Sequence, residues 1–273
     1  MKKFDGILMV TDLDGTLLRE DKSISEENLK AIEYFKSQGG KFAFVTGRIP
    51  VAAKHVYEWA KPNVPCGCSN GGGIYDYNAE KLIWCQELSK DVMDIVEYVD
   101  INLPPMGIEV CTFDKIYFCK KNGSTEKHRI NEHFDDLGGH YRDVKDVVSK
   151  ILFADEEEEN LICLMDMLKK HPDAEKYDFV RSDKEYYEIL PKGISKGAVL
   201  KKLTEILEVD SQKTIAVGDN DNDIEMIKRA KIGIAVENAS ENAKAVADYV
   251  TVSNEEHAIA KIIEDLDKGK INI

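Results

Sequence analysis

The N-terminal part of the chain alternates short apolar runs with segments in which apolar residues recur every three or four positions. Gly6 to Val10 is typical of a buried strand, and Lys41 to Val45 is a second such run. Between these runs, Leu29, Ile32 and Phe35 lie on one face of a predicted helix. Another helix follows the second strand, and this order of strand, helix, strand and helix predicts a parallel sheet with right-handed crossovers.

The same alternation returns near the C-terminus. Ser195 is typical of the N-cap of a helix that runs to about Leu207, and Thr214 to Val217 is a further apolar strand. The remaining elements expected here are a helix holding Ile224, Met226 and Ile227, a strand at Ile232 to Val236, a helix around Ala243 to Ala247 and a strand at Tyr249 to Val252.

The middle of the chain has a different pattern. Strands such as Ile108 to Thr112 and Ile116 to Cys119 follow each other closely and are mixed with helices near 91–99 and 157–169. We therefore expect an α/β protein: a Rossmann-like parallel-sheet core domain that carries an inserted α+β cap domain. The expected bounds are 1–81 and 188–273 for the core domain and 82–187 for the inserted domain.

Composition and charge narrow the classes of partner. Of the 273 residues, 43% are hydrophobic and 32% are charged, and the net charge of -14 disfavours nucleic acid and anionic lipid as partners. No apolar stretch is long enough to span a membrane, and the N-terminus does not resemble a signal peptide. The six cysteines lack the spacing of a disulfide framework or a zinc site, which favours reduced thiols and a cytoplasmic location.

Three polar clusters directly follow predicted parallel strands. They are Asp12-Leu13-Asp14-Gly15-Thr16, Thr46-Gly47-Arg48 and Gly218-Asp219-Asn220-Asp221-Asn222-Asp223. Open α/β sheets bind their ligands at the carboxyl edge of the strands. Each cluster alone is compatible with helix capping or a turn, but three at one edge indicate a functional site.

The carboxylates in these clusters call for a cation. Asp12 and Asp14 are two positions apart on an extended segment, so both lean to the same side. Asp219, Asp221 and Asp223 bring more negative charge, and like charges 4 Å apart repel by about 4 kcal/mol at an effective dielectric constant of 20. Oxygen ligands without a nearby histidine pair favour Mg²⁺ over zinc.

Basic and hydroxyl side chains could hold an anion beside this cation. Lys196 is expected in the first turn of a helix, where its charge opposes the macrodipole, so it either bends out to solvent or faces a bound anion. Arg48 lies just before Pro50 and leaves the same two alternatives. The hydroxyl of Thr46 and the backbone amides of Thr46 to Arg48 could cradle a phosphate.

Over essentially its whole length the chain resembles the haloacid dehalogenase-like superfamily of phosphohydrolases, in particular its Cof-type branch, which carries a large cap of the C2B type. The matching motifs, in order, are Asp12-Leu13-Asp14-Gly15-Thr16, Thr46-Gly47-Arg48, Lys196 within Gly193-Ile194-Ser195-Lys196-Gly197, and Gly218-Asp219 with Asn222-Asp223. Ser69-Asn70-Gly71 also matches a stretch that precedes the cap in this family.

The resemblance implies a role for each of these residues. Asp12 would be the nucleophile, which forms an aspartyl-phosphate, and Asp14 the general acid and base. Mg²⁺ would be held by Asp12, the backbone carbonyl of Asp14 and Asp219, with Asp223 in support. The phosphoryl oxygens would be held by the Leu13 amide, Thr46, Gly47, Lys196 and Asn222.

The resemblance also implies a lid function for the inserted domain, with hinges near Gly71-Gly72-Gly73 and Leu190-Pro191. The expected partner is a small phosphorylated metabolite, such as a sugar phosphate, and the expected state is a monomer or small homo-oligomer. Two other functions stay open on the sequence: a phosphomutase acting on a hexose phosphate, and a catalytically silent phosphate-binding regulatory module.

Overall fold

The computed structural model describes residues 2–132 and 134–273, which form two compact units. Unit 1 contains the chain up to Gly47, Ala53–Trp84 and Ser195–Ile273, and unit 2 contains Arg48–Ala52 and Cys85–Ile194. The sequence predicted an inserted domain at 82–187. It did not predict that the short segment Arg48–Ala52 groups with that inserted part.

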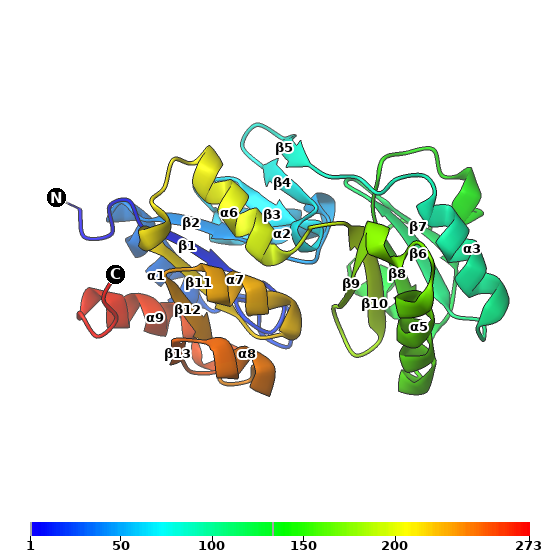
Figure 1. Ribbon diagram of the computed structural model, residues 1–273. Coiled ribbons are helices and arrows are strands. Elements are labelled where there is room, and N and C mark those ends of the chain that lie inside the picture. The colour runs from blue at the N-terminus through cyan, green and yellow to red at the C-terminus, as the bar shows by residue number, and fades with distance from the viewer. Residues whose placement is uncertain (1, 133) are drawn as a thin grey trace. The chain divides into compact units, whose positions relative to one another are not determined.

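A five-stranded parallel sheet forms the centre of unit 1, in the order β13-β12-β11-β1-β2 (Figure 1). Its strands are β1 (Leu8–Thr11), β2 (Lys41–Phe44), β11 (Thr214–Gly218), β12 (Ile232–Ala235) and β13 (Tyr249–Val250). Every residue of β1 is buried, as its unbroken apolar run predicts for a strand covered on both faces. The Rossmann-like core that the sequence indicates is therefore confirmed.

The helices of unit 1 lie between and after these strands in the sequence. They are α1 (Glu26–Ser37), α2 (Pro50–Ala60), which begins within the Arg48–Ala52 segment of unit 2, α6 (Lys196–Ile206), α7 (Ile224–Arg229), α8 (Glu241–Val246) and α9 (Ala258–Asp267). From β1 the chain moves through α1 to β2, whereas from β11 it moves through α7 to β12 in the opposite direction along the sheet. With right-handed crossovers, α1 and α7 cover opposite faces, and the strand order reverses between β1 and β11.

A small sheet of β3 (Cys66–Cys68), β4 (Gly73–Asp76) and β5 (Lys81–Cys85) completes unit 1. The turn between β3 and β4 contains Gly71, whose φ is +103°. A Cβ atom at Gly71 would lie 2.2 Å from the backbone oxygen of Ser195, so a close approach of two backbone segments requires glycine here. Gly71 lies inside unit 1, whereas the chain passes between the units after Gly47, Ala52, Trp84 and Ile194, so this division of the chain gives no support to the expected hinge at the glycine run.

Unit 2 is built on a five-stranded antiparallel sheet in the order β7-β6-β8-β10-β9. Its elements are α3 (Val92–Asn102), β6 (Gly107–Thr112), β7 (Ile116–Lys120), α4 (Gly123–Asn131), β8 (Val148–Ala154), α5 (Glu158–Lys170), β9 (Tyr177–Arg181) and β10 (Tyr186–Pro191). One face of the sheet packs against apolar residues of α3 and α5, including Val96 and Leu164. The α+β character expected for the insertion is confirmed. Among the residues that the structure describes, no helix is long and apolar enough to cross a membrane.

The opposite face of this sheet carries buried ion pairs. Lys150 on β8 lies 2.8 Å from Glu188 on β10, measured from Nζ to Oε1. Glu109 on β6 is fully buried, and its Oε2 lies 2.9 Å from Nδ1 of His128 on α4. Burial alone would lower the pKa of His128, but the Glu109 carboxylate outweighs it and the pKa is raised above 6.5.

This pair predicts a pH dependence of stability. A histidine with a raised pKa in the folded state stabilises fully below its unfolded pKa of about 6.5, and the contribution disappears as pH rises through the folded pKa. The free energy of unfolding should therefore fall as pH rises from about 6.5 through the folded pKa, by about 1.4 kcal/mol in total for each unit by which folding raises the pKa. Denaturant unfolding of the wild type at several pH values should show this slope, and His128→Gln should lack it. The exposed His140→Gln is the control, and an equal slope in His128→Gln would contradict the prediction.

Candidate active site

The carboxyl ends of β1 and β11 bring the first and last acidic clusters together. The backbone N–H of Asp12, directly after β1, donates to the carbonyl of Val217 on β11 over 2.9 Å. Asp219 follows the last residue of β11. Because the strand order reverses between these two strands, their ends form the crevice in which doubly wound sheets bind ligands. The structure thus brings together Asp12 and Asp219, which are far apart in the sequence.

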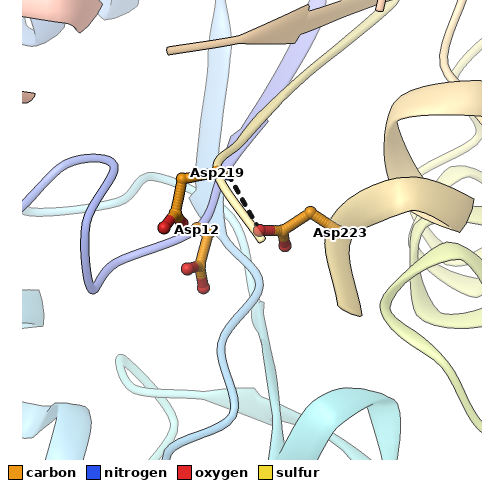
Figure 2. A group of neighbouring side chains, drawn as sticks. All are labelled: Asp12, Asp219 and Asp223. Atoms are coloured by element: carbon orange, nitrogen blue, oxygen red, sulfur yellow. Dashed lines mark hydrogen bonds between the residues drawn. The ribbon is translucent and has the colours of Figure 1, made fainter. Parts of the chain in front are cut away.

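Three carboxylates and one ammonium group form the centre of the site. Each of Asp12, Asp219 and Asp223 offers an oxygen, and these atoms lie within 4.8 Å of one another (Figure 2). Nζ of Lys196, at the first position of α6, lies 2.7 Å from Oδ1 of Asp12 and 2.7 Å from Oδ1 of Asp223. The side chain of Lys196 is only 1% exposed, so the prediction that it bends out to solvent is wrong. Instead, its ammonium group lies between the carboxylates of Asp12 and Asp223.

Asp223 is held by the backbone of the turn that follows β11 and by Lys196. Its Oδ2 accepts hydrogen bonds from the backbone N–H groups of Asp219 and Asn220 over 3.0 and 3.1 Å (Figure 2 shows the first). Its Oδ1 accepts from Lys196. Asp223 therefore fixes the turn after β11 and the position of the lysine, which agrees with a supporting role beside the other two carboxylates.

Asp219 is oriented by the loop that follows Asp12. Its Oδ1 accepts a hydrogen bond of 2.9 Å from the hydroxyl of Thr16. At Gly15, whose φ is +78°, a Cβ atom would lie 2.5 Å from Oδ2 of Asp219. The glycine and threonine of the first motif thus leave room for the Asp219 carboxylate and hold it, a function that the sequence did not reveal.

The electrostatics of the centre fit a divalent cation. Burial raises the pKa of Asp12 well above its usual range against the opposing effect of Lys196, and Asp223 and Asp219 add to the rise. Burial and the Asp223 carboxylate likewise raise the pKa of Asp219 to about 7. One ammonium group faces three carboxylates, and these are oxygen donors that suit a hard cation such as Mg²⁺. The cluster could therefore hold a metal ion.

The side chain of Asp14 lies in an ion pair outside this group. Its Oδ1 is 2.7 Å from Nζ of Lys22, and both side chains are more than one-third exposed. An exposed pair of this kind contributes only about 0–1 kcal/mol, so Asp14 can leave it at little cost. Among the described residues, the carboxylate of Asp14 is not part of the three-aspartate cluster; the sequence analysis expected its backbone carbonyl, rather than its carboxylate, as a ligand.

Asn70, in the buried loop between β3 and β4, contacts two of the expected phosphate-binding residues of unit 1. Thr46 is 1% exposed, and its carbonyl accepts a hydrogen bond of 3.0 Å from the backbone N–H of Asn70. The side chain of Asn70 also accepts from Nδ2 of Asn222 over 3.1 Å. Leu13 is buried, and its carbonyl accepts from Thr16 and Leu18. The structure therefore connects the second and fourth motifs through Asn70, to which the sequence analysis gave no role.

Arg48 differs from the other expected site residues. It groups with unit 2, where its guanidinium is paired with Glu132, and both side chains are nearly buried. This partner depends on a contact distant in sequence, which no local pattern around Arg48 predicts. Its expected role at the phosphate stays a prediction.

Unit 1 is thus a doubly wound parallel sheet that carries an aspartate cluster able to hold a metal ion, at the point where its strand order reverses. The chain belongs to the family of haloacid dehalogenase-like hydrolases, whose model matches residues 9–263. The resemblance that the four motifs indicate is thereby confirmed.

Curated relatives and a solved structure match almost the whole chain. The putative phosphatase YxeH of Bacillus subtilis is 29% identical, covering 95% of this chain and 97% of the relative. The 5-amino-6-(5-phospho-D-ribitylamino)uracil phosphatase YwtE of the same organism is 30% identical, covering 95% and 97%. The crystal structure of a haloacid dehalogenase-like hydrolase from Bacteroides thetaiotaomicron superimposes with a TM-score of 0.83 at 26% identity, covering 95% of this chain and 99% of that one.

Proposed function

We propose that this protein is a Mg²⁺-dependent phosphatase that hydrolyses phosphomonoesters of small metabolites through an aspartyl-phosphate on Asp12. The observation that carries the proposal is the meeting of Asp12, Asp219 and Asp223 with the buried Lys196 at the carboxyl edge of the sheet. Membership in a hydrolase family and relatives that are named phosphatases support it.

Asp12 and Asp14 divide the chemistry between them. An oxygen of Asp12 attacks phosphorus, and the bond from phosphorus to the leaving alcohol oxygen breaks while Asp14 protonates that oxygen. In the second step Asp14 takes a proton from water, whose oxygen attacks phosphorus and displaces Asp12. The side chain of Asp14 is more than one-third exposed and its ion pair with Lys22 is weak, which is compatible with both proton transfers.

The remaining residues hold charge and position. Lys196 neutralises negative charge beside Asp12, and Thr46, Gly47, Asn222 and the Leu13 amide bind the phosphoryl oxygens. Mg²⁺ would be held by Asp12, Asp219 and the Asp14 carbonyl, with Asp223 in support, and when bound it offsets the charge of the phosphoryl group.

The proposed function is tested by phosphate release and its dependence on metal. Purified protein is incubated with p-nitrophenyl phosphate and a panel of sugar and nucleotide phosphates, and free phosphate is measured. We expect turnover with Mg²⁺, loss of nearly all activity with a chelator, and recovery when Mg²⁺ is restored in excess, because several of the predicted metal ligands are carboxylates that repel one another without a cation.

Other outcomes separate the rival functions. Activity that is indifferent to chelation would contradict the role given to the aspartate centre. Isomerisation of a hexose phosphate with negligible release of phosphate would indicate a phosphomutase. Tight binding of phosphate without any turnover would indicate a regulatory module.

A further inference from the structure

The loop between β3 and β4 has an unusual backbone. Ser69, Asn70 and Gly71 have φ values of +52°, +53° and +103°, so three successive residues adopt the left-handed region. For a residue other than glycine this region costs roughly 1–2 kcal/mol, less for asparagine, and it persists where the surroundings impose it. Ser69 and Asn70 are both buried. The contacts around this buried loop must therefore hold it in the left-handed conformation.

The side chain and backbone of Asn70 contact two expected phosphate-binding segments. Its N–H donates to the carbonyl of Thr46 over 3.0 Å, and its Oδ1 accepts from Nδ2 of Asn222 over 3.1 Å. At Gly47 a Cβ atom would lie 3.1 Å from Oδ1 of Asn70, so the turn after Thr46 packs directly on this amide. Asn70 thus contacts two segments that are far apart in the sequence, the turn after Thr46 and the segment that carries Asn222.

The next residue of the loop reaches a third segment. Gly71 approaches the carbonyl of Ser195, whose hydroxyl accepts from the N–H of Ala198 and caps the helix in which Lys196 is the first residue. The left-handed turn at Asn70 delivers Gly71 to this contact. The loop therefore ties together the segments that carry Thr46, Lys196 and Asn222.

The contact with Asn70 also sets the orientation of the Asn222 amide. An amide nitrogen carries two hydrogens, and Asn70 accepts one of them. The second N–H stays available for a further acceptor. In this orientation Oδ1 of Asn222 is buried without a hydrogen-bond partner among the described residues, which is unfavourable for Asn222 itself. The acceptor on Asn70 thus selects the orientation in which Asn222 offers an N–H rather than an oxygen.

We propose that Asn70 is a positioning residue of the phosphate site, which orients the Asn222 amide and braces the Thr46–Gly47 turn so that both donate to the same phosphoryl group. This inference rests on the proposed function, because it concerns how the phosphoryl group is bound. Asn70 acts through its neighbours and takes no part in bond making or proton transfer.

The test compares Asn70→Gly with wild type. Glycine retains the left-handed backbone and removes only the amide. For the variant we expect KM for p-nitrophenyl phosphate and the inhibition constant of inorganic phosphate to rise about tenfold, the loss expected for one hydrogen bond in a binding site. Thermal unfolding is measured in parallel. The matched control is Glu80→Gly, an exposed residue with a φ of +47°, which should leave both constants unchanged.

A double-mutant cycle with Asn222→Ala separates positioning from a structural role. If Asn70 acts through Asn222, adding Asn70→Gly to Asn222→Ala should change the inhibition constant by much less than tenfold. Independent effects in the cycle, or unchanged KM and inhibition constant in Asn70→Gly, would overturn the inference. A lower melting temperature with unchanged constants would likewise indicate a structural role.

Three further outcomes are decisive. Should Asn70→Gly not fold, Asn70→Ala takes its place: it also removes the oxygen that accepts from Asn222, so an unchanged KM and inhibition constant in the folded Asn70→Ala protein would contradict the inference. A wild-type protein that neither hydrolyses any phosphomonoester nor binds inorganic phosphate would refute the proposed function, and the inference would fall with it. An active wild type with a normal Asn70→Gly variant refutes the inference alone.

Discussion

Replacing Asp12 with asparagine is expected to lower kcat by a factor on the order of 10⁴ or more, the scale seen when a covalent nucleophile is removed. The amide has nearly the same shape as the carboxylate, but its neutral oxygen and nitrogen do not form a stable bond to phosphorus. Phosphate release from the best substrate of the panel, measured in the presence of Mg²⁺, checks this result.

The same substitution should leave the fold intact. Burial and the neighbouring carboxylates raise the pKa of Asp12, which means that its ionised form is unfavourable in the folded protein without metal. A group whose pKa is raised on folding destabilises the protein above its unfolded pKa, so a neutral amide relieves repulsion at neutral pH. Lys196 retains Asp223 as a partner. In the presence of a chelator, the melting temperature of Asp12→Asn should equal or exceed that of the wild type.

Asp166→Asn supplies the matched control, because Asp166 is exposed on α5 in unit 2 and undergoes the same chemical change. We expect this control to retain normal turnover. If Asp12→Asn kept kcat within tenfold of the wild type while the control behaved normally, Asp12 would not be the nucleophile.

The fold of unit 1 was largely predictable because its elements carry local signals. Ser195 was expected to cap a helix, and α6 begins at Lys196 with the Ser195 hydroxyl accepting from Ala198. The buried strands β1 and β11 likewise follow from unbroken apolar runs. Where a strand is as short as β3, which contains glycine and two cysteines, neither periodicity nor composition identifies it, and the sequence analysis did not predict it.

Pairings between distant residues set the limit of sequence reasoning. Nothing near Lys150 or Glu188 shows that they meet, because their contact depends on the register between β8 and β10. The glycine run was interpreted as a hinge for a similar reason. The backbone oxygen of Ser195 that makes Gly71 necessary lies in another part of the chain.

The site shows the same division between what was predictable and what was not. Asp12 and Asp219 could be placed at one edge of the sheet, because carboxyl ends of parallel strands share an edge. The contacts of Thr16 with Asp219 and of Asn70 with Asn222 could not be predicted, since they depend on loop conformations that only the folded chain defines. The sequence thus predicts the acidic ends of the strands, but it does not predict the groups that orient the side chains of the site.

Replacing Lys196 with methionine should cost both stability and activity. The lysine is buried, and its ammonium group lies 2.7 Å from both Asp12 and Asp223. Burial alone would lower the pKa of Lys196, but these two carboxylates outweigh it and raise the pKa above 10.5, so the group is charged throughout the neutral range. Removing one member of a buried charge network typically costs about 3–5 kcal/mol, because the remaining charges lose their partner.

The loss of stability should depend on pH and on metal. Above the usual pKa range of a carboxylate, the folded variant must hold ionised carboxylates without their ammonium partner, and at low pH protonation removes that cost. Denaturant unfolding with a chelator should therefore show a large deficit for Lys196→Met near neutral pH and a smaller one in acid. Added Mg²⁺ should recover part of the deficit, because the cation supplies positive charge between the carboxylates in place of the missing ammonium group and so stabilises the variant more than the wild type.

Lys201→Met is the matched control, because Lys201 lies on the same helix with its side chain 65% exposed and a distant ion pair to Glu205. Its effect on unfolding should stay within about 0.5 kcal/mol. For Lys196→Met we further expect turnover to fall by about 10³, the loss typical of removing a group that stabilises charge in the transition state. A Lys196→Met protein with the stability and turnover of the Lys201→Met control would mean that the three carboxylates tolerate one another without the lysine. The electrostatic basis of the proposed site would then be wrong, even if Asp12 proved to be the nucleophile.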